Sequence, residues 1–363
     1  LENYPRLVDR IARTRPLWGN SGQVLRKIRD PWLVQRVLRE AELPVPEMVP
    51  RGQIPPTDTG WLRKPLASAA GQNICHWTAA AAAAANASPE MRRFCFQRYQ
   101  PGTPHSLLFL AGWPQSGRAT LLGITRQLME ADQAPPAANH NRSSSTAGGP
   151  PVNRPAAETL FRYAGSLGPV ELAPPCLARL QQTVTALTTQ CGLRGLCGLD
   201  FILDDNETAW PVEINPRYPA SAEVLELALG LPLLQLHAAS FLPAEELLVR
   251  QAADFLQRAN LSPSGPAVGK LIVPAPATLR TDDRLLARLR ERYPHSPPAA
   301  AGDFHLPGVC LADCPAAGES IPIGNPFCTL LAAAQSLLHC HEILLSETAA
   351  LLGLLREDAS PAC

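Results

Sequence analysis

The chain has 363 residues, and its 32 lysine and arginine residues balance its 32 aspartate and glutamate residues. This balance leaves no overall field that would favour nucleic acid or an anionic membrane surface, so the expected partners are small molecules. Domains commonly hold about 150 residues, and the length therefore leaves room for two or three compact units.

Two further absences in the sequence indicate where the protein works. No continuous apolar run reaches the roughly 20 residues of a membrane span, and the basic N-terminus lacks the apolar core of a signal peptide. The ten cysteines are scattered, with no CxxC pair, and Cys191, Cys197 and Cys328 lie in apolar segments. These features predict a cytoplasmic protein with buried, reduced thiols rather than a disulfide framework or a zinc site.

The first third of the chain predicts a helix followed by a small sheet. Residues 29–46 have a helical apolar pattern, with Pro31 in the first turn and a proline stop at the end. The segments 60–66 (GWLRKPL) and 74–77 (ICHW) predict two strands of a hairpin, joined by the small-residue loop ASAAGQN. Seven alanines at 79–85 predict a linker or a short helix.

Strand-like and helical patterns alternate through the rest of the chain. The segments 93–102 (RFCFQRYQPG), 105–112 and 119–128 predict strands, and residues 129–157 predict a mobile surface insertion. Residues 174–193 predict a helix, and residues 222–241 predict a helix pair or one kinked helix. The C-terminal part mixes short strands with one long helix that ends near Leu355.

A polar hairpin between residues 195 and 217 carries the strongest chemical signal. The connection Asp205-Asn206-Glu207-Thr208 predicts a β-turn between two apolar runs. If Asp204 pairs with Ala209, then Asp200 lies opposite Glu213. Asn215 then shares their face, while residues of the opposite face form core: Phe201, Leu203, Trp210, Val212 and Ile214.

Two carboxylates that face each other repel unless a cation lies between them. Carboxylate and amide oxygens suit Mg²⁺, which also takes ligands from water and substrate phosphates. The hairpin alone is equally compatible with a solvated polar sheet face that carries scattered acids.

The order of these motifs resembles the ATP-grasp superfamily, whose C-terminal sheet carries an acid followed by E-x-N. The matching segments are LRGLCGLDFIL and WPVEINPRYPAS, and the resemblance extends over residues 18–345. Within the superfamily the chain looks like the carboxylate-amine ligase branch that includes tyramine-glutamate ligases. Only about 17 residues precede WGNSGQVL, so the usual upstream α/β domain is expected to be missing.

The resemblance implies an α+β fold with two subdomains of mainly antiparallel sheets that clamp a nucleotide, plus a small C-terminal α/β unit. We expect residues 1–20 to be the remnant of an upstream domain and 21–105 to form the helix and lid subdomain. Residues 106–245 would form the subdomain with the metal site, including the insertion 129–157. Residues 246–363 would form the C-terminal strand and helix unit.

The resemblance also assigns roles to residues. It implies Asp200, Glu213 and Asn215 as Mg²⁺ ligands, with Mn²⁺ as an alternative metal. Lys64 would reach the nucleotide phosphates, and Arg217 would face the transferring phosphoryl group, so these two would be catalytic. The remaining implied nucleotide contacts are Lys27 on the phosphate side and Gln97, Arg98 and Tyr99 around the adenine.

Two weaker candidates complete the predicted site. The loop tip with Ser68 and Gly71 would let backbone N–H groups approach the phosphates, although it has one glycine where relatives have two or three. Arg126 could bind a substrate carboxylate through its forked guanidinium, or be a surface arginine at a strand end.

These residues predict an ATP- and Mg²⁺-dependent ligase that forms an amide from a carboxylate and an amine through an acyl phosphate. Two alternatives remain open: an ATP-binding module without turnover, and a carboxylase-type enzyme that forms carboxyphosphate. No nucleic acid or membrane partner is expected, and the sequence leaves a homo-oligomer open. It identifies no general base.

Overall fold

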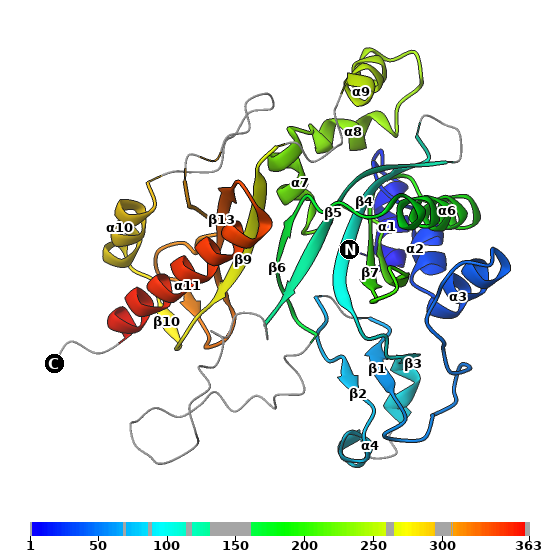
Figure 1. Cartoon of the computed structure of the whole chain (residues 1–363), viewed down its shortest axis with the longest axis horizontal. Helices are drawn as coiled ribbons and strands as arrows, with labels where there is room; N and C mark the ends of the chain where they lie inside the picture. Colours follow the sequence, from blue (N-terminus) through cyan, green and yellow to red (C-terminus); the bar gives the residue numbers. More distant parts are fainter. Residues whose placement is uncertain are drawn as a thin grey trace.

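The structure is a computed structural model that describes residues 2–67, 70–85, 89–113, 118–130, 161–258, 265–294, 306 and 308–359. Within this part of the chain, an eight-stranded sheet runs through the molecule in the order β11-β13-β9-β6-β5-β4-β7-β8, and all neighbours are antiparallel (Figure 1). The strands are β4 (Thr103–Ala111), β5 (Ala119–Met129), β6 (Tyr163–Gly168), β7 (Gly195–Leu203), β8 (Ala209–Asn215), β9 (Ala267–Pro274), β11 (Cys310–Ala312) and β13 (Pro326–Ala334).

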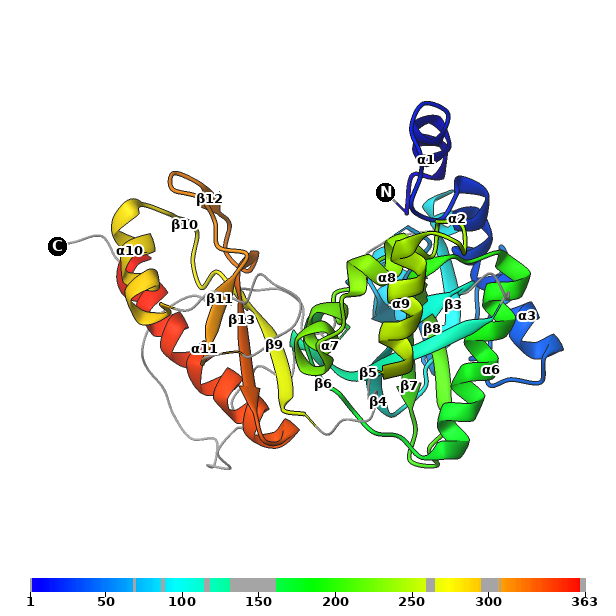
Figure 2. The same ribbon diagram turned by 90° about the horizontal axis from the view of Figure 1, so that it is seen from above.

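The central strand β4 is buried on both faces because helices cover both sides of the sheet. Leu107 and Phe109 pack with helices α2 (Gly22–Ile28), α3 (Pro31–Glu40) and α6 (Pro174–Cys191). Leu108 and Leu110 pack on the other side with α7 (Ala222–Leu229), α8 (Leu233–Ala239) and α9 (Leu247–Arg258). Figure 2 shows α6 on one face and α7 to α9 on the other. The alternation follows from the period of two in a strand.

A separate three-stranded sheet, named the lid sheet or lid, lies in the region that was predicted to form the lid. Its order is β2-β1-β3, with β1 (Trp61–Pro65) antiparallel to both β2 (Cys75–His76) and β3 (Phe94–Arg98). The predicted hairpin of β1 and β2 is therefore confirmed. A small apolar cluster of Val49, Trp77 and Phe96 supports this sheet. The seven alanines form the helix α4 (Ala79–Ala85), which is followed by the 3-10 helix η1 (Pro89–Arg93).

Helix boundaries agree with the sequence where a capping residue is present. Asp30 caps α3, since its side chain accepts hydrogen bonds from the backbone N–H groups of Trp32 and Leu33 at 3.1 and 3.4 Å. This helix ends at Glu40, before the predicted proline stop. The predicted pair at 222–241 forms α7 and α8, which bend by 108°. The helix α1 (Pro5–Ala12) precedes them all.

The C-terminal strands join the central sheet, so the sheet crosses the predicted boundary at 245/246. β9 is hydrogen-bonded to β6 and to β13, which in turn pairs with β11. The helix α11 (Leu337–Ala359) covers this end of the sheet, and α10 (Asp283–Arg292) packs beside it. A two-stranded sheet of β10 (Leu279–Arg280) and β12 (Ser320–Ile321) lies at the edge of this half. The predicted insertion 129–157 lies outside the described residues except for the end of β5.

The long C-terminal helix α11 is also apolar over most of its length. Residues Leu337–Asp358 of α11 meet the length and composition of a membrane span, with a mean hydropathy of 1.2. Charged residues such as Glu342 and Glu347 interrupt the apolar run, which is why no continuous run was found. The face of α11 with Leu344, Leu351 and Leu355 is fully buried against the sheet. This face packs into the core, while 22% of the apolar window as a whole is buried.

Candidate active site

The hairpin of β7 and β8 brings Asp200 opposite Glu213, as predicted. The turn register differs from the prediction, because Leu203 rather than Asp204 pairs with Ala209. A bulge at Val212 restores the pairing, since Phe201 faces Pro211 while Asp200 faces Glu213. Two residues predicted on the core face therefore lie elsewhere. Val212 lines the cleft, and Trp210 pairs with Ile202, which also lines the cleft.

Asp200 carries the strongest electrostatic signature of the site. Burial and the neighbouring charge of Glu213 raise the pKa of Asp200 from 3.8 to about 7. Hydrogen bonds from Ser106, Gln127 and Asn215 act in the opposite direction. The amide nitrogen Nδ2 of Asn215 donates to Oδ2 of Asp200 at 3.0 Å. The two acids and the amide thus form one cluster, named the metal face after its predicted role.

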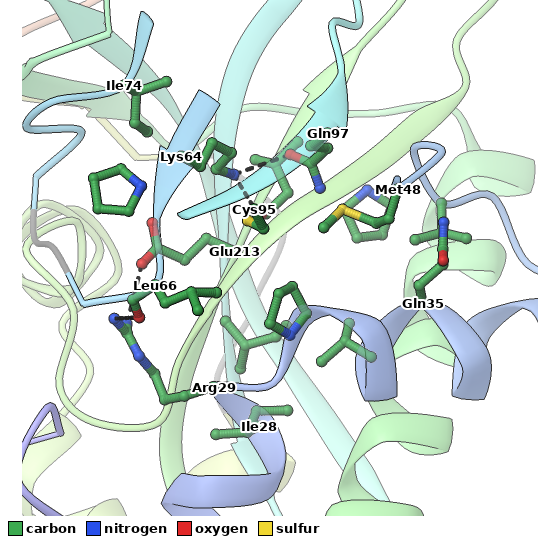
Figure 3. Close-up of a pocket in the computed structure, with 17 residues that line it drawn as sticks. Ile28, Arg29, Gln35, Met48, Lys64, Leu66, Ile74, Cys95, Gln97 and Glu213 are labelled. Atoms are coloured by element: carbon green, nitrogen blue, oxygen red, sulfur yellow. Dashed lines mark hydrogen bonds and ion pairs between the residues drawn. The ribbon is translucent and has the colours of Figure 1, made fainter. Parts of the chain in front are cut away.

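Arg29 is the cation that reaches Glu213. Its guanidinium donates to Oε1 of Glu213 at 3.3 Å and to the backbone oxygen of Leu66 at 3.4 Å (Figure 3). Lys27, to which the resemblance gives a phosphate-side role, lies on α2 and is not among the residues that line the cleft or its side cavity. No local pattern signals Arg29, because 184 residues separate it from Glu213.

Lys64 lies on the cleft-facing side of the lid. Its Nζ donates to Oε1 of Gln97 and to the backbone oxygen of Val212, both at 3.0 Å (Figure 3). The amine therefore bridges the lid sheet and the metal-face hairpin. A lysine at this position is a point charge that suits a phosphate group.

The predicted adenine-side residues lie where the lid joins the central sheet. Gln97 is buried and lines the cleft. Arg98 also lines it, although its guanidinium stacks over Trp61 at 4.8 Å and donates to the backbone oxygen of Thr59. Tyr99 is 39% exposed and meets the ring of His76 edge-on at 4.9 Å. An aromatic and two amphipathic side chains at this position can cover the edge of a base.

The lid loop touches the start of β6. The backbone N–H of Tyr163 donates to the oxygen of Ala70 at 3.3 Å. Gly71 has φ +71°, and a Cβ at this position would collide with the backbone oxygen of Phe161. Glycine is thus required both by the backbone and by the close approach. Ser68, the other predicted tip residue, lies outside the described residues.

Two arginines line the cleft beyond the metal face. Arg126 is an exposed residue of β5 on the wall of the cleft, near Gln127 and Tyr163. Arg217 follows the E-x-N segment and donates to Oδ1 of Asn215 at 3.4 Å and to Glu2 at 3.2 Å. Both are therefore placed where an anionic substrate could meet them.

Most of the predicted residues surround one cleft of about 540 Å³ between the lid and the central sheet, and Lys27 does not line it. A smaller side cavity of about 90 Å³ extends from it towards α2 and α3, and Lys64, Gln97 and Glu213 line both (Figure 3). The predicted residues that line the cleft are Lys64, Gly71, Gln97, Arg98, Tyr99, Arg126, Asp200, Glu213, Asn215 and Arg217.

Sequence reasoning missed the residue that fixes the end of the hairpin. Asn20 is 6% exposed, and its amide donates to the backbone oxygens of Pro216 and Arg194 at 3.0 and 3.1 Å. It also accepts from the backbone N–H of Arg194 at 3.0 Å. These bonds hold the peptide between Asn215 and Arg217, but a lone asparagine in a loop gives no sequence signal.

The donor set fits a hard cation that shares its coordination with a ligand. Within the described residues, no group of three or more histidine, cysteine, aspartate or glutamate side chains could hold a metal. Two carboxylates and one amide oxygen instead match Mg²⁺, which completes its octahedron with water and phosphate oxygens. Burial first, and then the charge of Glu213, raise the pKa of Asp200, and a bound cation would offset the second of these effects.

The lid sheet and the central sheet enclose one cleft that carries Lys64 and an acidic face, an arrangement that can clamp a nucleotide. A family model described as an ATP-grasp domain matches residues 28–221, which is more than half of the chain. The chain therefore belongs to the ATP-grasp family. None of the curated proteins compared with the chain matches it.

Solved structures of several enzymes have the same fold. An L-amino acid ligase from Bacillus licheniformis has a TM-score of 0.61 at 13% identity and covers 99% of this chain and 78% of its own. The biotin carboxylase domain of Hydrogenobacter thermophilus 2-oxoglutarate carboxylase, in complex with MgADP, ADP and bicarbonate, has a TM-score of 0.60 at 14% identity. The match covers 92% of this chain and 68% of that domain's chain. A carboxyaminoimidazole ribonucleotide synthase from Aspergillus clavatus in complex with ATP has a TM-score of 0.62 at 10% identity. The match covers 96% of this chain and 79% of the synthase chain. At these identities the likeness shows the fold alone.

Proposed function

We propose that the protein is an ADP-forming ligase that joins a carboxylate and an amine into an amide. The observation that carries the proposal is the metal face of Asp200, Glu213 and Asn215, flanked by Lys64 and Arg217 on one cleft. Two facing carboxylates are unfavourable unless a cation offsets their repulsion, and a metal nucleotide supplies that cation. The L-amino acid ligase with the same fold shows that this fold is compatible with the proposed class of reaction.

The acidic, basic and aromatic residues of the cleft would bind different parts of the metal nucleotide. Asp200, Glu213 and Asn215 would hold Mg²⁺, which when bound neutralises charge on the β and γ phosphoryl oxygens. Lys64 would bind phosphoryl oxygens from the lid side, while Gln97, Arg98 and Tyr99 would contact the base. Phosphoryl transfer asks the protein mainly for this kind of positioning and charge stabilisation.

The reaction would run in two steps. A carboxylate oxygen attacks the γ-phosphorus, the bond from that phosphorus to the bridging oxygen breaks, and ADP leaves. The amine nitrogen then attacks the acyl carbon, and phosphate leaves with the oxygen that attacked first. Arg217 would stabilise the acyl phosphate, and Arg126 would bind a carboxylate of the substrate through a forked contact. No side chain is assigned as the base that takes the proton of the amine.

The second candidate is carboxylase chemistry, in which bicarbonate replaces the substrate carboxylate and carboxyphosphate forms. The TM-score for the biotin carboxylase domain, 0.60, nearly equals the value for the ligase, 0.61. The tyramine-glutamate ligase branch remains a finer prediction within the first candidate. The cytoplasmic location and the domain boundaries also remain predictions.

A screen for ADP release separates the two candidates. The protein is incubated with MgATP and with amino acids and amines supplied in pairs, and in parallel with bicarbonate, with and without biotin. We expect ADP to form only when a carboxylate and an amine are both present. ADP release that depends on bicarbonate alone, or on biotin, would assign the chain to the carboxylases. Nucleotide binding without ADP release in any combination would leave a binding module.

A further inference from the structure

The first residues of the chain make two contacts with the cations of the metal face. The guanidinium of Arg217 donates to Oε1 of Glu2 at 3.2 Å. The guanidinium of Arg29 donates to Oδ1 of Asn3 at 2.8 Å. The same two arginines also donate to the metal face, Arg217 to Asn215 and Arg29 to Glu213. Glu2 and Asn3 therefore lie at the outer ends of two short chains of hydrogen bonds.

The carboxylate of Glu2 is unusually buried for a residue outside the core. Its side chain is 10% exposed, whereas the side chain of Arg217 is 46% exposed. Oε2 of Glu2 is buried and has no hydrogen-bond partner in the described part of the chain. A buried carboxylate oxygen without a hydrogen-bond donor costs free energy. Arg217 therefore offsets only part of the cost of burying the Glu2 carboxylate.

The position of Glu2 matches what a substrate anion would need. Arg217 lies on the wall of the cleft, beside Asn215, and it binds an oxygen of a carboxylate in the structure. Charge-assisted bonds from a guanidinium suit carboxylate and phosphate oxygens equally. An oxyanion that entered the cleft at Arg217 would meet a site that an internal carboxylate already fills.

We propose that Glu2 and Asn3 occupy an oxyanion subsite formed by Arg217 and Arg29, and that an entering carboxylate or phosphate displaces them. The segment is then an internal competitor of the anionic substrate. This inference rests on the proposed function for its purpose, since it concerns the substrate side of the same cleft. Its physical content, the exchange of one oxyanion for another at Arg217, does not depend on turnover.

Competition of this kind has a defined size. Suppose that the state with Glu2 bound to Arg217 is about five times more populated than the state with Arg217 free. The apparent affinity of Arg217 for an added anion is then about sixfold lower than its intrinsic affinity. Removing the negative charge of Glu2 should restore most of that factor. Because the competitor belongs to the same chain, its effect does not depend on protein concentration.

The test uses the full chain with acetate and inorganic phosphate as separate probes. The apparent dissociation constant of each anion is obtained from the rise of the thermal midpoint with its concentration, for the wild type and for Glu2→Gln. Glu40→Gln, at an exposed position on α3, is the matched control. Arg217→Ala is the control that should abolish anion binding. Hydrogen exchange of residues 2–8 in the wild type is followed with and without each anion.

We expect Glu2→Gln to bind at least one probe about fivefold more tightly than the wild type, while Glu40→Gln is unchanged. We also expect that probe to speed hydrogen exchange at residues 2–8. Tighter acetate binding alone would identify a subsite for the substrate carboxylate, and tighter phosphate binding alone one for phosphoryl oxygens. Unchanged or weaker binding of both anions to Glu2→Gln would overturn the proposal and would make Glu2 a support for Arg217. An absence of ADP release in the function screen would leave this result untouched.

Discussion

At the scale of single residues, the charge pair of Asp200 and Glu213 defines the site. The sequence predicts their pairing because alternation along two strands and a short turn fix which side chains face each other. It does not predict the distant ion pairs around them: Arg29 lies 184 residues from Glu213, and Glu2 lies 215 residues from Arg217. Such distant contacts depend on how whole elements pack, which local patterns do not record.

The role of Glu213 can be tested by removing only its charge. Glu213→Gln keeps the size of the side chain but removes one anionic ligand, so we expect ADP formation to fall by about two orders of magnitude or more. The thermal midpoint should stay close to that of the wild type. Glu207→Gln, on the exposed turn of the same hairpin, should retain activity. Near-normal ADP formation by Glu213→Gln would remove this residue from the metal face.

The raised pKa of Asp200 makes the stability of the metal-free protein depend on pH. A carboxyl whose folded pKa lies near 7, against 3.8 ordinarily, favours the folded state below pH 4 and loses that contribution as pH rises to 7. Asp200→Asn removes this loss. We therefore expect the variant to exceed the wild type by up to about 4 kcal/mol in free energy of unfolding at pH 8, and by about 1 kcal/mol at pH 4.5.

Denaturant unfolding at both pH values in the absence of metal measures this difference. Asp205→Asn, an exposed change in the same hairpin, serves as the control and should show the same small effect at both values. An equal gain for Asp200→Asn at pH 4.5 and pH 8 would mean that Asp200 does not titrate in this range.

At the scale of elements, the lid depends on a contact that its sequence only partly predicts. The loop between β1 and β2 is recognisable from its small residues, and the hairpin forms as predicted. Its contact with Phe161 and Tyr163 could not be predicted, because these residues begin a strand of the other sheet. The contact explains why the single glycine at position 71 matters.

Gly71→Ala tests whether this contact closes the cleft. The new Cβ would force the loop away from Phe161, and its φ of +71° would be strained for alanine. We expect the affinity for ATP, measured by calorimetry, to fall about tenfold, a loss of roughly 1.4 kcal/mol. Gly318→Ala has a similar φ of +87° with open space around it and should bind ATP like the wild type. Equal affinities in the two variants would show that closure does not depend on Gly71.

At the scale of the whole molecule, one sheet unites parts of the chain that the sequence analysis kept separate. Each C-terminal strand is visible locally, but the pairing of β9 with β6 joins residues about a hundred positions apart. Registers between such strands are set by burial on both faces of the assembled sheet. The fold family was predictable from the order of its motifs, whereas the continuity of the sheet was not.

The buried face of α11 packs against the C-terminal strands of this continuous sheet. Leu351 is fully buried against the sheet, and truncation of a buried leucine leaves a cavity. We expect Leu351→Ala to lower the free energy of unfolding by about 2–5 kcal/mol. Leu338 is 70% exposed on the same helix, and Leu338→Ala should change the free energy of unfolding by less than about 0.5 kcal/mol. Equal effects at the two positions would contradict the observed face of the helix.

The transfer of oxygen from substrate to phosphate tests the central claim most directly. The protein is incubated with MgATP, an amine and a carboxylic acid labelled with ¹⁸O, chosen from the pair that releases ADP. Attack of the carboxylate on the γ-phosphorus predicts one labelled oxygen in each phosphate released, as measured by mass spectrometry. Phosphate that carries no label while the amide forms would contradict the acyl phosphate, and with it the account of this cleft.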